Sequence, residues 1–243
     1  MKKLFVAASM LAIAAAAPIT AQAGEVSVST SVDYVTDYVF RGVSLADSAI
    51  QPGVEMAMGN FSAGAWFSTG VGDTSILAGD EVDLYMGYSL SLSDTVSLDL
   101  GATYYHYPQG GSLFETNNGA AGTYEVSAGV SFDTMLSPFA TVYYDFTLEA
   151  LTLEGSLGHS LPVGEKTALD LGVSAGLVDG DGFSYEYAGA SASLGYSFTD
   201  AVSAYVAANF ALSSEDTLNY KKMLAGDPKD SLFFFGAGIA AGF

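Results

Sequence analysis

The sequence predicts an all-β fold, a transmembrane antiparallel β-barrel of about 12 strands. Three observations predict it. Half of the residues are hydrophobic and only 14% are charged, which is too apolar for a disordered acidic chain. Apolar and polar residues alternate along most of the chain, as they do in a strand whose two faces meet different surroundings. After residue 23 no apolar run approaches the roughly 20 residues of a membrane helix, whereas barrel strands need only about 10.

Charge and composition exclude other classes of protein. The chain carries 27 acidic residues against 7 basic ones, for a formal net charge of −20, so its surface would repel nucleic acid. It contains no cysteine, which excludes a disulfide framework and a thiolate metal site. We therefore expect no nucleic-acid partner, and the sequence indicates no cofactor and no dedicated metal site.

The N-terminal segment has the features of a secretory signal peptide. Lys2 and Lys3 supply the positive start, an apolar stretch covers 4–17, and Ala21-Gln22-Ala23 provides a small-residue cleavage site. The alternative is an N-terminal membrane anchor, but a cleavage site stands where the flank of an anchor would be. The sequence therefore predicts a signal peptide over 1–23 and one outer-membrane barrel domain over 24–243.

The alternation divides the chain into twelve segments of strand length. It is clearest over 81–105, where the even positions are mostly apolar and the odd positions are mostly small, acidic or tyrosine. The predicted strands are 25–41, 49–58, 61–70, 81–92, 95–107, 123–133, 136–147, 148–161, 167–178, 185–198, 201–212 and 231–243.

The connections between these segments alternate between short and long. Tight turns fall at 59–60, 93–94, 133–135, 162–166 and 199–200, and the longer connections are 42–48, 71–80, 108–122, 179–184 and 213–230. The junction near Thr147 is the exception. Short periplasmic turns and longer outer loops are typical of bacterial outer-membrane barrels, so we expect both termini to be periplasmic.

Aromatic residues on the outward-facing positions gather near both ends of the predicted strands. At the outer end these are Tyr38, Phe40, Phe67, Tyr104, Tyr144, Phe146, Phe210 and Phe233, and at the periplasmic end Phe61, Phe132, Tyr196, Phe198 and Phe243. Two such bands are typical of a barrel wall at its two membrane interfaces. A secreted β-sandwich, whose strands also alternate, is the alternative.

Two parts of the sequence resemble known outer-membrane proteins. The last segment, 233–243, ends on Phe243 and looks like the C-terminal signal that the barrel assembly machinery reads. The segment Asp37-Tyr38-Val39-Phe40-Arg41-Gly42-Val43-Ser44, then Ala49-Ile50-Gln51-Pro52-Gly53 and 81–88, resembles the TorF family of porins. The resemblance implies a barrel in the bacterial outer membrane with a channel role, and it assigns no catalytic or ligand-binding residue.

The inward-facing positions indicate what the barrel interior would conduct. They are mostly glycine, serine, alanine and threonine, which leaves room for a narrow pore, although glycines also permit strand curvature. The predicted pore-lining residues are Asp33, Asp37, Arg41, Glu55, Glu81, Asp83, Asp99, Glu125, Asp145, Glu154, Asp170 and Glu186. A lumen rich in carboxylates favours cations, or else the acids serve to hydrate the lumen or to bind structural divalent ions.

The role of Arg41, and that of the loop with Lys221 and Lys222, can each be interpreted in two ways. Arg41 either forms a salt bridge to Glu55 or a neighbouring strand, which would fix loop 42–48, or stands in the constriction that a solute must pass. Loop 213–230, with Lys221 and Lys222, either folds inward and narrows the pore or lies outside in solvent.

Other function classes find little support in the sequence. The two histidines, His106 and His159, take outward positions near opposite ends of the barrel, so they do not make one catalytic site. The loop 179–182 has two aspartates between glycines but lacks the other ligands of an EF-hand. We expect a passive channel for small cationic or hydrophilic solutes. The alternative is a non-conducting structural barrel, or an adhesin that presents loop 108–122.

Overall fold

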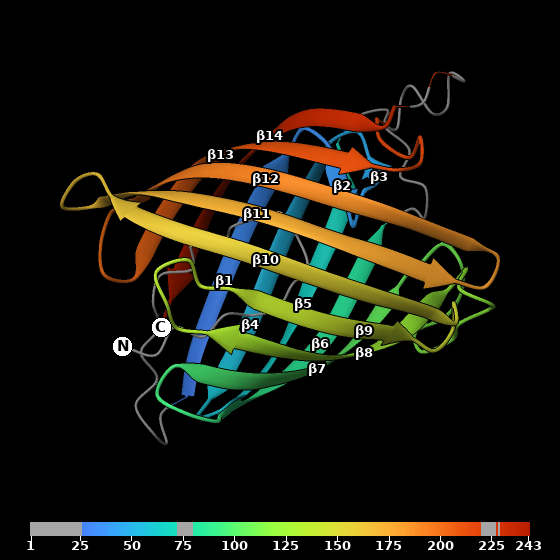
Figure 1. The fold of residues 1–243 in the computed structure, drawn as a ribbon, viewed down its shortest axis with the longest axis horizontal. Helices are drawn as coiled ribbons and strands as arrows, with labels where there is room; N and C mark the ends of the chain where they lie inside the picture. The colour runs from blue at the N-terminus through green and yellow to red at the C-terminus, as the bar shows by residue number, and fades with distance from the viewer. Residues whose placement is uncertain (1–25, 72–79, 220–226, 228) are drawn as a thin grey trace.

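Twelve antiparallel strands close into a single barrel in the computed structural model (Figure 1). The structure describes residues 26–71, 80–219, 227 and 229–243, so the predicted signal peptide, Lys221 and Lys222 lie outside the described residues. Each wall strand pairs with its neighbours in the chain, and the first strand pairs with the last, which closes the ring. Among the described residues, no helix is long and apolar enough to cross a membrane.

The twelve wall strands correspond to the twelve predicted segments. They are β1 (Val26–Val35), β4 (Ala49–Met58), β5 (Phe61–Gly70), β6 (Glu81–Ser91), β7 (Val96–His106), β8 (Gly122–Phe132), β9 (Phe139–Asp145), β10 (Ala150–Pro162), β11 (Thr167–Gly180), β12 (Phe183–Ser197), β13 (Val202–Ser213) and β14 (Ser231–Gly242). Two short strands, β2 (Tyr38–Phe40) and β3 (Val43–Ala46), form a separate hairpin. The predicted fold class is confirmed.

The two ends of the described chain meet at one end of the barrel. Val28 and Phe243 exchange backbone hydrogen bonds of 3.1 and 2.9 Å, which seals the seam between β1 and β14. The short turns, such as Gly59-Asn60, lie at this end, which we term the turn end. The longer connections, such as 107–121, lie at the opposite end. We term this the outer end, because outer-membrane barrels carry their long loops outside.

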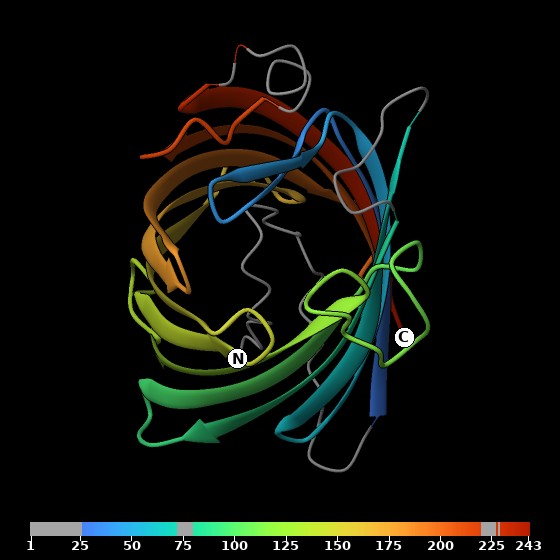
Figure 2. The ribbon, with the colours of Figure 1, turned by 90° about the vertical axis from the view of Figure 1, so that its right-hand side faces the viewer.

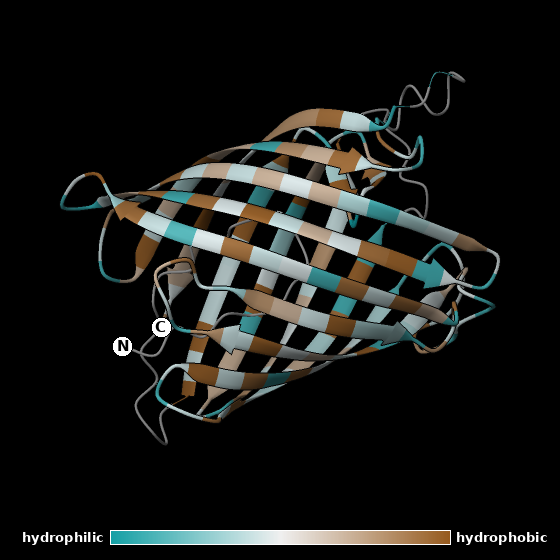
Figure 3. Cartoon of the chain, viewed as in Figure 1, coloured by the Kyte–Doolittle hydropathy of each residue, from teal (hydrophilic) through white to brown (hydrophobic). Residues whose placement is uncertain are grey.

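Large apolar side chains cover the outer face of the barrel. Val54, Met56, Leu157, Val206 and Ile239 are all more than 40% exposed, and brown and pale or teal residues alternate along the strands in Figure 3. An apolar outer face on the strands of a closed barrel is the feature of a wall that faces lipid. Most of the predicted aromatic bands are also exposed on this face: Phe67, Tyr144, Phe146, Phe210 and Phe233 near the outer end, and Phe132, Tyr196, Phe198 and Phe243 near the turn end.

The predicted strand 25–41 is too long, and its last residues lie inside the barrel. The wall strand β1 ends at Val35, and the chain then turns inward into the β2–β3 hairpin, which lies within the ring of strands in Figure 2. The hairpin turn is Arg41-Gly42, with φ of 45° and 78°. The prediction that Tyr38 and Phe40 belong to the outer aromatic band was therefore wrong.

Two local features of the outer end explain further departures from the predicted pattern. Tyr104 faces outward as predicted, but it is buried because Tyr124 stacks on its ring and Phe114 packs against it at a tilt. The connection near Thr147 is short because Asp145 caps it: its Oδ1 accepts hydrogen bonds of 2.8 Å from the backbone N–H groups of Thr147 and Leu148.

Candidate channel lumen

The structure places nine of the predicted acids on the inner face of the barrel wall. Alternation along each strand sends these side chains inward, and each lies opposite another inward residue on the neighbouring strand. The nine are Asp33, Glu55, Glu81, Asp83, Asp99, Glu125, Asp145, Glu154 and Asp170. Asp37 lies in the connection between β1 and β2, where it lines a pocket beside the hairpin.

Glu186 is the predicted pore-lining residue that the structure places elsewhere. It lies opposite Leu177 of β11, which is 40% exposed on the outer face, whereas its neighbours Tyr185 and Tyr187 point inward. The prediction assigned Glu186 to the wrong face because the inward positions of β12 are the odd ones. Glu186 therefore lies on the exterior of the barrel wall, close to the end that carries the long loops.

Arg41 forms a buried, two-pronged ion pair with Glu125 of β8. Its two terminal nitrogens lie 2.5 and 3.0 Å from the two carboxylate oxygens, and both side chains are 6% exposed. The ring of Tyr143 lies 4.1 Å from the guanidinium carbon, and Tyr105 donates a hydrogen bond of 3.0 Å to the same carboxylate. Arg41 therefore forms a salt bridge, but the predicted partner, Glu55 or a neighbouring strand, was wrong, because the hairpin carries Arg41 across the lumen to β8.

Burial and ion pairing act in opposite directions on Arg41. Burial alone would lower the pKa of the guanidinium, but the hydrogen bonds and charge of Glu125 outweigh it and raise the pKa above its ordinary value. The cation is therefore retained, and Arg41 neutralises one carboxylate. It is the only basic side chain among the described residues of the lumen.

Three inward tyrosines each lie across a glycine of the next strand and reach an acid on the strand beyond. The three rows are Tyr205–Gly238–Asp33, Tyr187–Gly176–Glu154 and Tyr85–Gly64–Glu55. The hydroxyl of Tyr205 donates to Asp33 at 2.7 Å, and that of Tyr187 donates to Glu154 at 2.5 Å. These rings need glycine, because a Cβ at Gly238 would lie 2.6 Å from Tyr205.

Sequence reasoning missed these tyrosines as lumen residues. It interpreted the inward glycines as groups that leave space, whereas three of them admit tyrosine rings. The signal was present in part: Tyr85 shares the parity of Glu81 and Asp83 in its own strand, whereas β12 and β13 carry no inward acid that would mark Tyr187 and Tyr205. What could not be read from one strand is the glycine opposite each ring, since that depends on the register between strands.

The lumen lining differs between the two halves of the barrel. On β6, β8 and β12 the acids and tyrosines lie toward the outer end, and glycine and serine follow toward the turn end. The outer half also contains the hairpin. On these three strands the turn half is therefore lined by smaller groups than the outer half.

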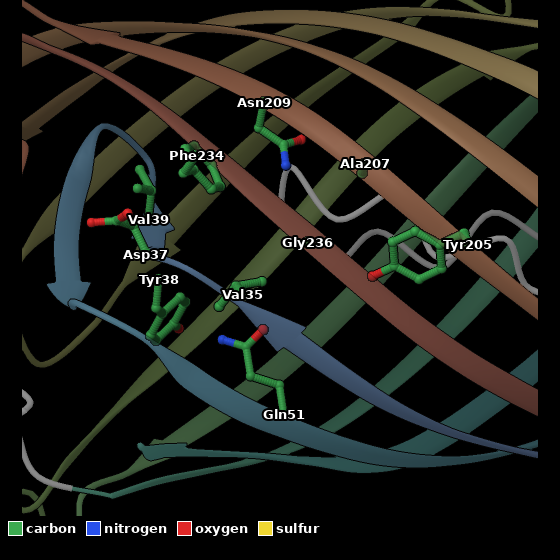
Figure 4. Close-up of a pocket in the computed structure, with 10 residues that line it drawn as sticks. All are labelled: Val35, Asp37, Tyr38, Val39, Gln51, Tyr205, Ala207, Asn209, Phe234 and Gly236. Atoms are coloured by element: carbon green, nitrogen blue, oxygen red, sulfur yellow. The ribbon is translucent and has the colours of Figure 1, made fainter. Parts of the chain in front are cut away.

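A pocket lies in the outer half, beside the hairpin (Figure 4). It is lined by Val35, Asp37, Tyr38, Val39, Gln51, Tyr205, Ala207, Asn209, Phe234 and Gly236. Within the described ranges, no three histidine or acidic side chains are grouped so as to hold a metal ion. The inward carboxylates of this arrangement can hydrate the lumen and attract cations.

The histidines take separate outward positions, as predicted. The Nδ1 atom of His106 lies 3.0 Å from the carbonyl oxygen of Ala121, near the outer end. The Nδ1 atom of His159 lies 2.7 Å from the carbonyl oxygen of Met135, near the turn end. The two rings therefore belong to different ends of the wall and do not make one site.

Solved structures share this fold at low sequence identity. The NanC porin matches with a TM-score of 0.59 and 13% identity, over 88% of this chain and 98% of that one. The KdgM porin matches at 0.56 and 10%, over 89% and 99%. The COG4313 outer membrane channel from Pseudomonas putida F1 matches at 0.54 and 9%, over 99% and 100%. The fold and the apolar outer face identify a barrel of the bacterial outer membrane.

The sequence comparisons add a family. No curated protein sequence matches the chain. A family model described as a bacterial protein of unknown function, Gcw_chp, matches residues 19–169, which is more than half of the 243 residues. With the twelve-stranded barrel established, this match shows that the chain belongs to the Gcw_chp family of bacterial proteins.

Proposed function

We propose that this barrel is a porin-like channel for passive diffusion of small solutes, with a preference for cations and neutral hydrophilic molecules. The observation that carries the proposal is the charge of the lumen: nine inward acids face one arginine among the described residues, and Glu125 already pairs with that arginine. Carboxylates in a confined, low-dielectric pore raise the local concentration of cations and repel anions.

Unpartnered acidic oxygens support this selectivity. The Oδ1 atom of Asp83 and the Oε2 atom of Glu55 are buried and have no hydrogen-bond partner within the described part of the chain. A buried carboxylate oxygen without a protein donor requires water or a cation. Because neither oxygen meets a protein donor among the described residues, both carboxylates add to the negative potential of the lumen.

The proposed solutes differ from that of a structural neighbour. The KdgM porin has also been solved in complex with disordered oligogalacturonate, a chain of negatively charged sugars. An acidic lumen repels such a polyanion, so we infer that this barrel admits other solutes. The resemblance to the TorF family of porins supports the same channel role. We propose no catalytic activity for this barrel.

A flux assay on the refolded protein tests the proposal. Proteoliposomes would be offered cationic, neutral and anionic solutes of similar size, and uptake would be measured against empty liposomes. Faster uptake of the cation than of the anion, with the neutral solute between them, supports an acidic diffusion channel. Faster uptake of the anion would contradict the proposed selectivity.

A non-conducting structural barrel is the second candidate, and one observation favours it. The β2–β3 hairpin lies within the outer half of the lumen, with Tyr38, Val39 and Arg41 all buried. A barrel closed there would serve as a membrane scaffold or would present loop 107–121 to partners outside. Absence of uptake for all three solutes, from demonstrably folded protein, would favour this candidate.

The C-terminus supports a proposal about assembly. The side chain of Phe243 is 79% exposed, and its backbone continues the pairing of β14 with β1. We propose that this terminal ring is read by the barrel assembly machinery before the barrel closes. Removal of Phe243 should lower the amount of folded barrel in the membrane, with refolding in detergent unaffected.

A further inference from the structure

The β2–β3 hairpin is too small to hold its position by itself. Its strands contain three and four residues, and an isolated two-stranded hairpin is at best marginally stable in water. Its place in the lumen must therefore come from contacts with the barrel wall. Those contacts are made on both sides of the lumen.

On one side the hairpin contacts strands β5, β6 and β7. The ring of Tyr38 packs against Trp66 with 5.5 Å between centroids, and its hydroxyl donates a hydrogen bond of 3.0 Å to Glu81. Phe40 meets Tyr105 edge to face at 5.9 Å. These aromatic contacts fix the distance of the hairpin from this wall.

On the other side the hairpin contacts β12, β13, β14 and the loop that follows β13. Val39 packs in an apolar cluster with Ala211, Leu218 and Phe234. The backbone N–H of Ser44 donates to the Thr217 carbonyl at 2.9 Å. Gly42 approaches the wall so closely that a Cβ there would lie 2.6 Å from the Cβ of Tyr187.

Arg41, at the tip of the hairpin, completes this span. Its guanidinium reaches β8 through Glu125 and β9 through the ring of Tyr143, so the hairpin contacts strands on opposite sides of the ring. The ion pair is buried, and loss of either partner would leave the other charge buried without its counter-charge. The pair therefore holds the tip strongly and in one geometry.

We propose that the β2–β3 hairpin is the constriction that limits permeation, and that the Arg41–Glu125 ion pair is the clasp that holds it across the lumen. This inference rests on the proposed channel function. The hairpin occupies the outer half of the barrel, and the turn half, where glycine and serine line β6, β8 and β12, forms a wider vestibule. Arg41 acts as a positioning residue, since its own charge is neutralised by Glu125.

Single-channel recording of three proteins tests the constriction. The first is the wild type, the second carries Arg41→Ala, and the third replaces residues 38–46 with a short Gly-Ser linker. We expect small steps from the wild type, larger and less regular steps from Arg41→Ala, and steps several-fold larger from the hairpin deletion. The deletion should also admit larger neutral polymers, which report the bore independently of charge.

A disulfide separates the position of the hairpin from the stability of the barrel. The sequence has no cysteine, so Val39→Cys with Ala211→Cys introduces a single cysteine pair within the apolar cluster, and its oxidation is checked before recording. Added to Arg41→Ala, the oxidised bridge should restore wild-type steps, and a reductant should enlarge them again in the same membrane. Current steps that stay enlarged after oxidation would contradict the proposal that the ion pair acts by holding the hairpin in place.

The outcomes distinguish this inference from the channel itself. A silent wild type with a conducting deletion variant supports the hairpin as the element that limits permeation but overturns passive diffusion through the intact barrel. Equal steps from wild type and deletion overturn the constriction and leave the channel in place. Silence from all three proteins, each shown to be folded by heat-modifiable gel mobility, overturns the proposed channel and this inference with it.

Discussion

Tyr187 of β12 lies so closely across Gly176 of β11 that a Cβ at the glycine would fall 2.5 Å from the tyrosine ring. The hydroxyl beyond it donates to Glu154 of β10 at 2.5 Å, so one ring ties three strands together. The same row recurs twice elsewhere in the wall. Inward glycine, tyrosine and acid therefore form one structural unit, in which the ring braces the wall and orients the carboxylate.

Gly176→Ala should destabilise the barrel by displacing the Tyr187 ring. Overpacking a tight site lowers the free energy of unfolding by roughly 1–3 kcal/mol, because neighbouring side chains must leave their preferred rotamers. The measurement is the urea midpoint for loss of the folded gel band. Gly158→Ala is the matched control, since the nearest atom to a Cβ there is a carbonyl oxygen at 3.8 Å. Equal midpoints for the two variants would refute the close packing.

Trp66 should report the position of the hairpin, because the sequence contains one tryptophan and it packs against Tyr38. In Arg41→Ala the tip of the hairpin loses its ion pair with Glu125. We therefore expect the fluorescence emission of Trp66 to shift to the red and to be quenched more strongly by acrylamide. Lys166→Ala removes a basic residue at the turn end and should leave the emission unchanged. Identical spectra for Arg41→Ala and the wild type would show that the hairpin keeps its place without the ion pair.

Hydrogen exchange should localise the effect of the ion pair. Removing one partner of a buried pair typically costs about 3–5 kcal/mol, and here the loss falls on a small hairpin and not on the closed wall. We expect faster amide exchange over 38–46 in both Arg41→Ala and Glu125→Gln, with β10 to β12 unchanged. Faster exchange spread evenly around the barrel would mean that the pair supports the wall itself.

The inward acids should set ion selectivity. Asp83→Asn, Asp99→Asn and Asp170→Asn together remove three charges at different levels of the lumen, and we expect a smaller reversal potential under a salt gradient. Glu186→Gln is the matched control, because Glu186 lies on the outer face and its charge is far from the conduction path. A triple variant with the selectivity of the wild type would exclude these acids from that path.

The sequence predicted the wall well because two-residue alternation is a local property. The twelve strands, the apolar outer face and nine of the inward acids follow from parity within each strand, once its face is assigned. Glu186 shows the weakness of that reasoning: one error of parity moves a residue to the opposite face.

The hairpin could not be derived in the same way. Its residues continue the alternation of β1, so Tyr38 and Phe40 had the pattern of a wall strand while lying inside the barrel. The ion pair joins residues 84 positions apart, and the tyrosine rows depend on strand register. These contacts are set by three-dimensional packing, which no single segment encodes.

The most direct test of the account is the reversal potential of single wild-type channels in a planar bilayer under a salt gradient. We predict discrete steps whose reversal potential has the sign of cation preference, because the lumen acids outnumber its one paired arginine. Discrete steps with anion preference would contradict the acidic conduction path. Silence from folded protein would contradict the channel itself.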